Sequence, residues 1–275
     1  MVRSEIMQKV NEPIQKLGGR IKQVGTRECE RCGASVPVFV RKDKEGNTHQ
    51  ESTCLDCETN KTRSQTPVKE DVQKEKVNDF AINNERIPEK LIGKTVSELI
   101  PENESETAMK ESVTDYIMNF GKTEHNSLVL AGAMGLGKSH LAYAAGIELR
   151  RQGFITMFIN TNDFLDLIKS TFGGKTVLSE RKIFEKIGQI DLLIFDEIGG
   201  EYDKNKNGFE SWASEKILKV ADSRETLPTI YTTNYSPAGF EKKYGNIQGG
   251  RIVSRMFAGA KRINVEGRDR RVQQF

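Results

Sequence analysis

From residue 127 onward, short apolar runs alternate with longer segments in which apolar residues recur at helical spacing. A short, continuous apolar run bounded by polar residues is typical of a strand that is buried on both faces. Strands that alternate with helices form a parallel sheet covered by those helices. The pattern predicts an α/β domain with strands at 127–131, 154–159, 191–195, 229–232 and 262–265 and helices at 139–151, 162–171, 209–223 and 237–244.

Two of these helices have start signals in the sequence. Ser236 is followed by Pro237, a cap and first-turn pair, and Thr161 precedes the helix at 162–171. A hydroxyl at this position accepts a hydrogen bond from a free backbone N–H of the first turn. We therefore expect Ser236 and Thr161 to cap their helices.

The first part of the chain has a different pattern. Apolar residues are spaced there like one face of a helix, which Pro13 interrupts. They are Ile6, Val10, Ile14 and Leu17. Between 58 and 78 almost every residue is polar or charged, which indicates a linker. We predict an N-terminal domain at 1–65, a linker at 66–79 and a main domain at 80–275.

Composition and charge argue against a membrane protein. The 275 residues contain no stretch that approaches the roughly 18 apolar residues needed to cross a bilayer, and the N-terminus lacks a signal peptide's apolar core. These features predict a cytoplasmic protein. The net charge is only +3, but from Glu241 to Phe275 nine Lys and Arg residues stand against three acids. Such a stretch is compatible with a phosphate-facing surface, and more commonly forms a solvated face.

Residues 132–139 match the phosphate-binding loop pattern G-x-x-x-x-G-K-[ST], between a predicted strand and a predicted helix. Gly132, Gly135 and Gly137 allow backbone N–H groups to turn toward phosphates, and the helix start adds positive potential. Lys138 is expected to reach the β- and γ-phosphates, and the Ser139 hydroxyl to hold Mg²⁺. The motif predicts that the chain binds ATP with Mg²⁺.

Polar residues end two further predicted strands. Asp196 and Glu197 follow the run at 192–195, and Asn234 follows the run at 230–233. Asp196 is expected to bind Mg²⁺ through water, Glu197 to polarise the attacking water, and Asn234 to hold that water near the γ-phosphate. The alternatives are two solvated acids at a strand end and a turn-forming Asn. Together with the phosphate-binding loop, the three residues predict ATP hydrolysis.

The four cysteines form two C-x-x-C pairs, Cys29/Cys32 and Cys54/Cys57, separated by 21 residues. Thiols stay reduced in the cytoplasm, so this metal-ligand spacing favours a Zn²⁺ site over disulfides. Four thiolates make a closed tetrahedral site, which is structural rather than catalytic and stabilises a small domain. His49 is an alternative ligand, and free thiols or a redox pair are the alternative interpretations.

Through these motifs the chain resembles a known family, the AAA+ helicase loaders of bacterial and phage replication (DnaC/DnaI-like), with the IstB-like transposition ATPases as near relatives. The resemblance covers about residues 80–275. It rests on His140-Leu-Ala after the phosphate-binding loop, on FDEIG at 195–199, on TTN at 232–234 and on GRIVSRM at 250–256. It implies an AAA+ P-loop NTPase fold and places His140 among the nucleotide-binding residues. Only ten residues follow Val265, so the expected fold has no C-terminal helical lid.

The resemblance also implies roles for arginines near the C-terminus. Arg255 matches the arginine finger that completes a neighbouring subunit's site, with Arg251 the less favoured candidate. Arg271 matches the second sensor arginine. Its motif departs from the family's Ser-Tyr-Arg ending, so Arg268 and Arg270 are alternatives for this role. The simpler alternative for each arginine is surface solubility.

The resemblance implies a DNA contact as well. Lys169 and Phe172 match positions that line a groove for single-stranded DNA, where a base can stack on an aromatic ring while a cation holds the backbone. The alternative is that Phe172 is a core residue.

Some helicase loaders carry a zinc-bearing N-terminal domain that grips the replicative helicase. The leading hypothesis is therefore a helicase loader for DNA replication, an ATPase that binds single-stranded DNA and places a hexameric DnaB-type helicase on DNA. It would act as a homo-oligomer, a ring or spiral hexamer, joined through Arg255. The first alternative is a transposition-associated ATPase that binds duplex DNA and recruits a transposase. The second is a protein that binds the helicase to inhibit it.

Overall fold

The computed structural model describes residues 21–43, 45–65, 69–174, 178–201 and 211–271, and the chain divides into two compact units at 1–72 and 73–275. The helical stripe predicted at Ile6, Val10, Ile14 and Leu17 lies outside the described residues. Within those residues, no helix has the length and apolar character needed to cross a bilayer.

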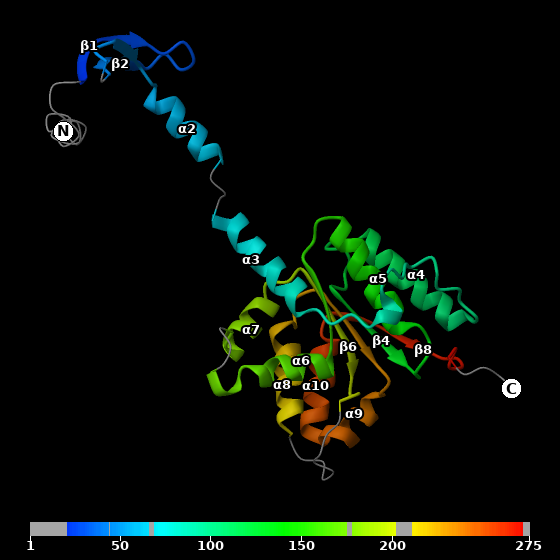
Figure 1. The fold of residues 1–275 in the computed structure, drawn as a ribbon. Coiled ribbons are helices and arrows are strands. Elements are labelled where there is room, and N and C mark those ends of the chain that lie inside the picture. Colours follow the sequence, from blue (N-terminus) through cyan, green and yellow to red (C-terminus); the bar gives the residue numbers. More distant parts are fainter. Residues whose placement is uncertain (1–20, 44, 66–68, 175–177, 202–210, 272–275) are drawn as a thin grey trace. The chain divides into compact units, whose positions relative to one another are not determined.

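The first unit contains a small antiparallel sheet in the order β1-β2-β3 (Figure 1). Its strands are β1 (Ile21–Glu28), β2 (Ser35–Lys42) and β3 (Thr48–Glu51), and helix α2 (Leu55–Gln65) follows them. Among the described residues of this unit, Cys29, Val36 and Cys54 form one small buried cluster. A cluster of this size buries too little apolar surface to stabilise a fold by itself. The cysteines therefore lie where additional stabilisation is needed.

Part of the linker that we predicted at 66–79 is helical. Residues from Lys69 to Asn84 form helix α3, while 66–68 lie outside the described part of the chain. Val77, Phe80 and Ala81 are three and four positions apart, so they share one helical face, and all three are buried in the core of the second unit. The sequence contains too few apolar residues here for composition alone to reveal this face.

The second unit is built on a five-stranded sheet in the order β5-β6-β7-β4-β8, and every neighbouring pair is parallel. Its strands lie within a few residues of the predicted ranges. They are β4 (Ser127–Gly132), β5 (Thr156–Asn160), β6 (Leu192–Ile198), β7 (Thr229–Thr233) and β8 (Ala260–Val265). The predicted parallel α/β sheet is confirmed.

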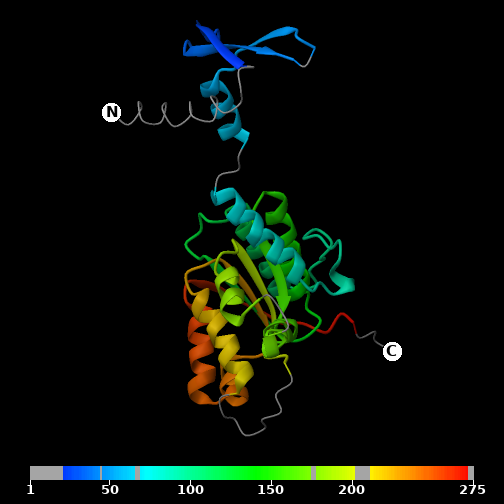
Figure 2. The same ribbon diagram turned by 60° about the vertical axis from the view of Figure 1, so that its left-hand side comes forward.

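Helices cover both faces of this sheet (Figures 1 and 2). Leu128 and Leu130 of β4 pack in one apolar cluster, while Val129 between them packs in the cluster on the opposite face. Successive side chains of a strand point to opposite faces, which explains why the strands are continuously apolar. One face carries α4 (Glu104–Met118) and α5 (Lys138–Arg151), and the other carries α6 (Thr161–Ser170), α7 (Glu180–Ile187), α8 (Trp212–Ser223), α9 (Pro237–Tyr244) and α10 (Asn246–Phe257).

The start of α6 differs from the prediction. Its cap is Asn160, whose side chain accepts a hydrogen bond from the backbone N–H of Asp163. Thr161 is the first helical residue and donates its hydroxyl to the carbonyl of Asp196, at 3.1 Å. The predicted cap therefore ties α6 to β6 instead.

The starts of two other helices can be compared with the predicted ones. Helix α8 begins at Trp212 and is capped by Ser211, later than the predicted start at 209. Ser236 caps α9 and Pro237 occupies its first turn, as predicted. Helix α7 had no counterpart among the predicted helices.

The outer edge of strand β5 is closed by an acidic side chain. Glu85, just after α3, accepts the backbone N–H of Phe158 at 3.0 Å. Its carboxylate also pairs with Arg150 of α5, which donates to both oxygens at 2.5 and 3.1 Å. The end of α3 is thereby fixed to the sheet and to α5.

Arg224, at the end of α8, is the largest fully buried side chain among the described residues. Its guanidinium donates to the carbonyls of Ile187 (2.9 Å), Ile190 (2.7 Å) and Pro228, and to the hydroxyl of Thr229 (3.1 Å). These four acceptors are neutral and lie at the loops that enter β6 and β7. One buried cation therefore satisfies the backbone at the edge of the sheet opposite the strands' carboxyl ends.

We expect Arg224→Met to destabilise the second unit by about 3 kcal/mol or more, because several buried acceptors lose their donor together. Urea unfolding followed by the fluorescence of Trp212, the single tryptophan of the chain, measures this. Arg151→Met is the control, because Arg151 is largely exposed and makes only a local pair with Glu148. An unchanged unfolding midpoint for Arg224→Met would contradict the structural role.

Candidate functional site

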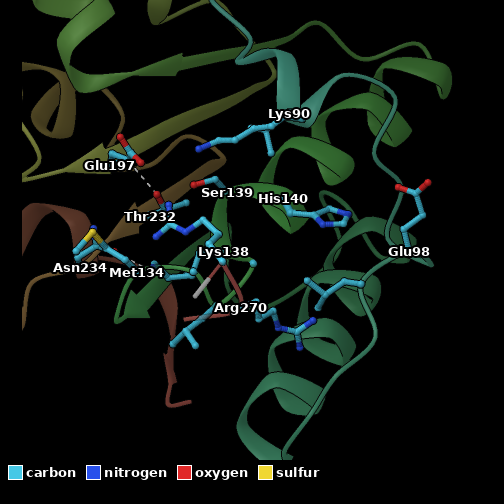
Figure 3. Close-up of a pocket in the computed structure, with 16 residues that line it drawn as sticks. Lys90, Glu98, Met134, Lys138, Ser139, His140, Glu197, Thr232, Asn234 and Arg270 are labelled. Carbon is cyan, nitrogen blue, oxygen red and sulfur yellow. Dashed lines mark hydrogen bonds between the residues drawn. The ribbon is translucent and has the colours of Figure 1, made fainter. Parts of the chain in front are cut away.

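A pocket of about 260 Å³ lies at the carboxyl ends of the central strands (Figure 3). It is lined by the phosphate-binding loop, by residues at the carboxyl ends of β6 and β7, and by a C-terminal arginine pair. In parallel α/β sheets, ligands bind at this end of the strands. The pocket brings together the predicted Lys138, Ser139, Glu197 and Asn234.

The phosphate-binding loop connects β4 to α5 and depends on its glycines. Gly135 and Gly137 have φ angles of 79° and 81°, in the left-handed region that favours glycine. A Cβ at Gly135 would lie 1.8 Å from Oδ1 of Asp269, and one at Gly137 would lie 2.2 Å from Cδ1 of Leu99. Both the backbone shape and the surrounding contacts therefore require glycine.

Lys138 is buried inside this loop. Its Nζ donates to the carbonyls of Gly132 (2.9 Å) and Ala133 (2.6 Å) and to Oδ1 of Asn234 (2.8 Å). Burial is the main cause that lowers the pKa of Lys138 to about 8, and the nearby carboxylates of Asp196 and Glu197 oppose this shift. The lysine and the predicted Asn234 thus meet directly at the ends of β4 and β7.

The two acids at the end of β6 have different surroundings. Asp196 is buried, and burial raises its pKa, while hydrogen bonds from the hydroxyls of Thr232 and Ser139 act in the opposite direction. Glu197 is exposed and faces the pocket (Figure 3). A hydroxyl and a carboxylate facing each other are oxygen ligands of the kind that Mg²⁺ prefers, so Ser139 and Asp196 fit a magnesium site.

Thr232 was not predicted as a site residue. Its hydroxyl donates to Oδ1 of Asp196 at 2.6 Å. It also accepts the backbone N–H of Glu197 at 2.9 Å (Figure 3). The TTN motif contains this residue, but nothing in its composition distinguishes Thr232 from Thr233. Only the pairing of β6 with β7 places it between the two acids.

Residues 89–99 form a further wall that the sequence did not reveal. Lys90 precedes Leu91 at the end of the short helix η1 (Glu89–Leu91), and its side chain points into the pocket from the wall opposite Lys138 (Figure 3). The ring of His140 bonds to the carbonyl of Thr95 at 2.8 Å. The predicted nucleotide-binding His140 therefore connects α5 to this wall.

The C-terminal arginines are held differently. Arg270 and Arg271 both line the pocket. Arg270 donates to the buried carboxylate of Glu106, whereas Arg271 pairs with Asp269 through Nε and Nη2, each at 2.9 Å. Arg268 pairs with the exposed Glu102 at 3.2 Å. Arg271 lines the pocket and pairs with its near neighbour Asp269, and its role as the sensor stays a prediction.

Arg255 does not line the pocket. On α10 its guanidinium pairs with Asp222 of α8 at 2.7 Å and with Glu225, just beyond α8, at 2.9 Å. Arg251 is exposed on the same helix. A role for Arg255 in a neighbouring subunit's site stays a prediction.

Lys169 and Phe172 lie beside Trp212, away from the pocket. The ring centres of Phe172 and Trp212 are 5.9 Å apart, and Nζ of Lys169 lies 5.7 Å from the centre of the Trp212 ring. Lys169 also pairs with Asp166 at 2.9 Å. Phe172 is 55% exposed, so it is not a core residue. The structure adds Trp212 to the predicted pair.

In the first unit, the Sγ atoms of Cys29, Cys32, Cys54 and Cys57 all lie within 4.8 Å of one another. Two of the separations are 3.7 Å and 3.5 Å. A tetrahedral site with Zn–S bonds of about 2.3 Å has S–S edges of about 3.8 Å, so the thiols fit such a site. His49 bonds instead to Asp43 at 2.9 Å and is not part of this group. The four thiols form a group that could hold a metal ion.

The family model described as "IstB-like ATP binding protein" matches residues 105–275. The chain belongs to this family of IstB-like ATP-binding proteins. The matched residues include the phosphate-binding loop, the acids at the end of β6 and the C-terminal arginines. The family is an ATP-binding one, and the phosphate-binding loop that lines the pocket lies within the match.

Curated relatives of this IstB-like protein are helicase loaders. "Replicative helicase loader DnaI" of Bacillus subtilis (strain 168) is 25% identical over 217 residues, which cover 74% of this chain and 67% of DnaI. "Replicative helicase loader DnaC" of Escherichia coli (strain K12) is 29% identical over 137 residues, which cover 48% of this chain and 51% of DnaC. The chain therefore matches about half of the length of this DnaC.

A solved structure confirms the fold of this IstB-like protein. The crystal structure of the DnaC helicase loader superposes with a TM-score of 0.54 at 21% identity, covering 65% of this chain and 100% of that chain. At this identity the likeness shows the fold alone. Together, the family match and these relatives confirm the resemblance to DnaC/DnaI-like AAA+ proteins.

Proposed function

We propose that this chain is a helicase loader for DNA replication, which uses ATP to place a hexameric DnaB-type helicase on single-stranded DNA. The observation that carries the proposal is the match to DnaI, a replicative helicase loader by name. That match covers 74% of the chain, more than residues 105–275 can supply. The similarity therefore includes part of the chain that precedes the family's ATP-binding region.

The pocket binds ATP through the phosphate-binding loop. Backbone N–H groups at Gly132, Gly135 and Gly137 face the phosphates. Lys138 gives up its hydrogen bonds to the loop carbonyls and binds the β- and γ-phosphates instead. Ser139 and Asp196 hold Mg²⁺, which when bound neutralises charge on those phosphates. His140 fixes the start of α5 against residues 89–99.

Hydrolysis requires a water molecule in line with the γ-phosphate. Glu197 polarises this water, and Asn234, which bonds to Lys138, holds it in place. Arg271 senses the γ-phosphate by leaving its ion pair with Asp269 and binding the phosphate instead. Arg255 of a neighbouring subunit completes the site, and must first leave Asp222 and Glu225 of its own chain. The proposed homo-oligomer, a ring or spiral hexamer, follows from that shared site.

The four thiolates of the first unit hold Zn²⁺ as a closed structural site. The support is the tetrahedral spacing of the sulfur atoms and the small apolar core around them. The same unit contacts the replicative helicase. Its part in the proposal is to recruit the helicase, while the second unit binds nucleotide and DNA.

Single-stranded DNA contacts Lys169, Phe172 and Trp212. Bases stack on the exposed ring of Phe172 and the half-buried ring of Trp212, and the lysine holds the backbone after releasing Asp166. The support is the exposure of Phe172 together with its contact to Trp212.

We expect single-stranded DNA to quench the fluorescence of Trp212, which is the only tryptophan in the chain. Phe172→Ala should weaken this binding about 5- to 150-fold, because stacking on one aromatic side chain is worth about 1–3 kcal/mol. Met118→Ala, which changes an exposed apolar residue of α4 instead, is the control. Unchanged fluorescence at saturating DNA would argue against this surface.

The test of the whole proposal is complex formation with the cognate helicase. Size-exclusion chromatography should show a complex of the full chain with that helicase, and unwinding assays should show stimulation at some ratio of the two proteins. Lys138→Ala is the nucleotide-binding control. Absence of a complex with and without ATP would overturn the loader, and inhibition of unwinding at every ratio would identify an antagonist.

The family match to IstB-like proteins also supports a second candidate, a transposition-associated ATPase that recruits a transposase. DNA preference separates the two. Tighter binding to duplex than to single-stranded DNA, without helicase binding, would favour the transposition ATPase.

A further inference from the structure

The residue pairing between strands β6 and β7 is shifted at Asp196 and Glu197. Phe195 pairs with Tyr231 and Ile198 with Thr233, so Asp196 and Glu197 together stand opposite the single residue Thr232. Two residues against one define a β-bulge, a feature that redirects side chains and is frequent beside active sites. Within this bulge Asp196 is buried and Glu197 is exposed.

The backbone at this bulge is unusual. Glu197 has a φ of 56°, and it is the only residue other than glycine with positive φ among the described residues. This conformation costs free energy for a residue with a Cβ, so surrounding contacts must hold it. The N–H of Glu197 donates to the hydroxyl oxygen of Thr232 at 2.9 Å, a side-chain contact from the neighbouring strand.

The direction of the hydrogen bonds at Thr232 is fixed. A backbone N–H can only donate, so the Thr232 oxygen is the acceptor toward Glu197. Its own hydrogen is then free for Oδ1 of Asp196, at 2.6 Å. Because the Thr232 side chain is buried, with the whole residue 1% exposed, water cannot easily replace either bond. One hydroxyl therefore ties the carboxylate of one acid to the backbone of the other.

We propose that Thr232 is a positioning residue of the nucleotide site. Its hydroxyl orients Asp196 and Glu197 for magnesium-dependent ATP binding and hydrolysis. The inference rests on the proposed ATPase function of the pocket. The hydrogen bond to Oδ1 orients the Asp196 carboxylate. Thr232 does not bond to Oδ2. Bonding to the N–H of Glu197 holds the bulge that turns this side chain toward the pocket.

The neighbouring Thr233 offers a matched control. It is also buried in β7, and its hydroxyl donates to the carbonyl of Ile198 at 2.7 Å, but not to either acid. Thr→Val at either position removes one buried hydroxyl with almost no change in shape. Thr232→Ser keeps the hydroxyl and should rescue the function.

The experiment compares the dissociation constant of ATP with Mg²⁺ and with EDTA, and measures turnover separately. Thr232→Val should lose about tenfold or more in the affinity gained from Mg²⁺, and about 10- to 100-fold in kcat, because a hydrogen bond to a charged group is lost. Its affinity for ATP in EDTA should stay within threefold of wild type, which also reports that the site is folded. Thr232→Ser and Thr233→Val should stay within threefold in all three measurements.

Wild-type magnesium dependence in Thr232→Val, or an equal loss in Thr233→Val, would overturn the role of Thr232 while leaving the ATPase intact. Thr232→Ala provides a second test if the valine variant binds no ATP in EDTA, and it should show the same loss of magnesium dependence. A wild-type chain that neither binds nor hydrolyses magnesium ATP would instead overturn the proposed function, and the role of Thr232 with it.

Discussion

Glu197→Gln is expected to leave ATP bound but to stop its hydrolysis. Gln has nearly the same size as Glu and keeps one acceptor oxygen, but it cannot take a proton from water. Loss of a general base typically reduces the rate by about 10²–10⁴-fold, and we expect kcat to fall in this range. The affinity for ATP should change by only a fewfold, because Lys138 and Ser139 are unaltered.

The measurement is phosphate release at saturating ATP, with equilibrium binding of a fluorescent ATP analogue as the parallel readout. Glu98→Gln is a suitable control because Glu98 lines the same pocket from residues 89–99, away from the bulge. It should retain turnover within a fewfold of wild type. Retention of more than a tenth of wild-type kcat by Glu197→Gln would rule out its role as the base.

Removal of the metal should unfold the first unit while the second unit stays folded. Small metal domains whose core cannot support them alone are unfolded without metal. Here the described residues of the first unit contribute little buried apolar surface beyond Val36 and Val38, and every residue of β1 is exposed. Thiolate–metal bonds are therefore expected to be the main stabilising interaction of this unit.

Treatment with a zinc chelator, or the variant Cys54→Ser, should make the first unit sensitive to limited proteolysis. Metal analysis should find one zinc per chain in the wild type. The fluorescence of Trp212 reports on the second unit and should not change. His49→Ala is the control, since His49 bonds to Asp43 and lies outside the cysteine group, and it should keep its metal. A first unit that resists proteolysis without metal would contradict the proposal.

The sheet of the second unit was predictable because its strands are buried on both faces. Continuous apolar runs such as Leu192–Phe195 leave a direct signal in the sequence. Parallel strands then bring their carboxyl ends to one edge, so Lys138, Asp196 and Asn234 meet there although they are far apart in the chain. Motif spacing and topology together were sufficient for this part of the site.

Other parts of the site depend on contacts that leave no recognisable pattern in the amino-acid sequence. Thr232 acts through the register between two strands, and Lys90 reaches the pocket from a segment without periodicity. Arg224 satisfies backbone carbonyls, which any sequence contains. The ion pairs of Arg255 with acids in and just beyond α8 could not be inferred either, because they depend on how α10 packs against α8.

Helix α3 shows a further limit of composition. Its polar residues outnumber the apolar ones, and only the spacing of Val77, Phe80 and Ala81 indicates the buried face. The misplaced cap at Thr161 has a similar cause. Asn160 and Thr161 are both good caps, and only the end of β5 decides which of them precedes the first helical turn.

The contact between Glu85 and strand β5 has a consequence for how copies of this chain can associate. An open strand at the edge of a sheet is a template on which strands of other molecules can add, which leads to aggregation. The N–H of Phe158 donates to the charged carboxylate of Glu85, which also pairs with Arg150. Arg150 also donates to the carbonyl of Thr156 at 2.7 Å, so these two backbone groups of β5 are unavailable to a strand of another copy.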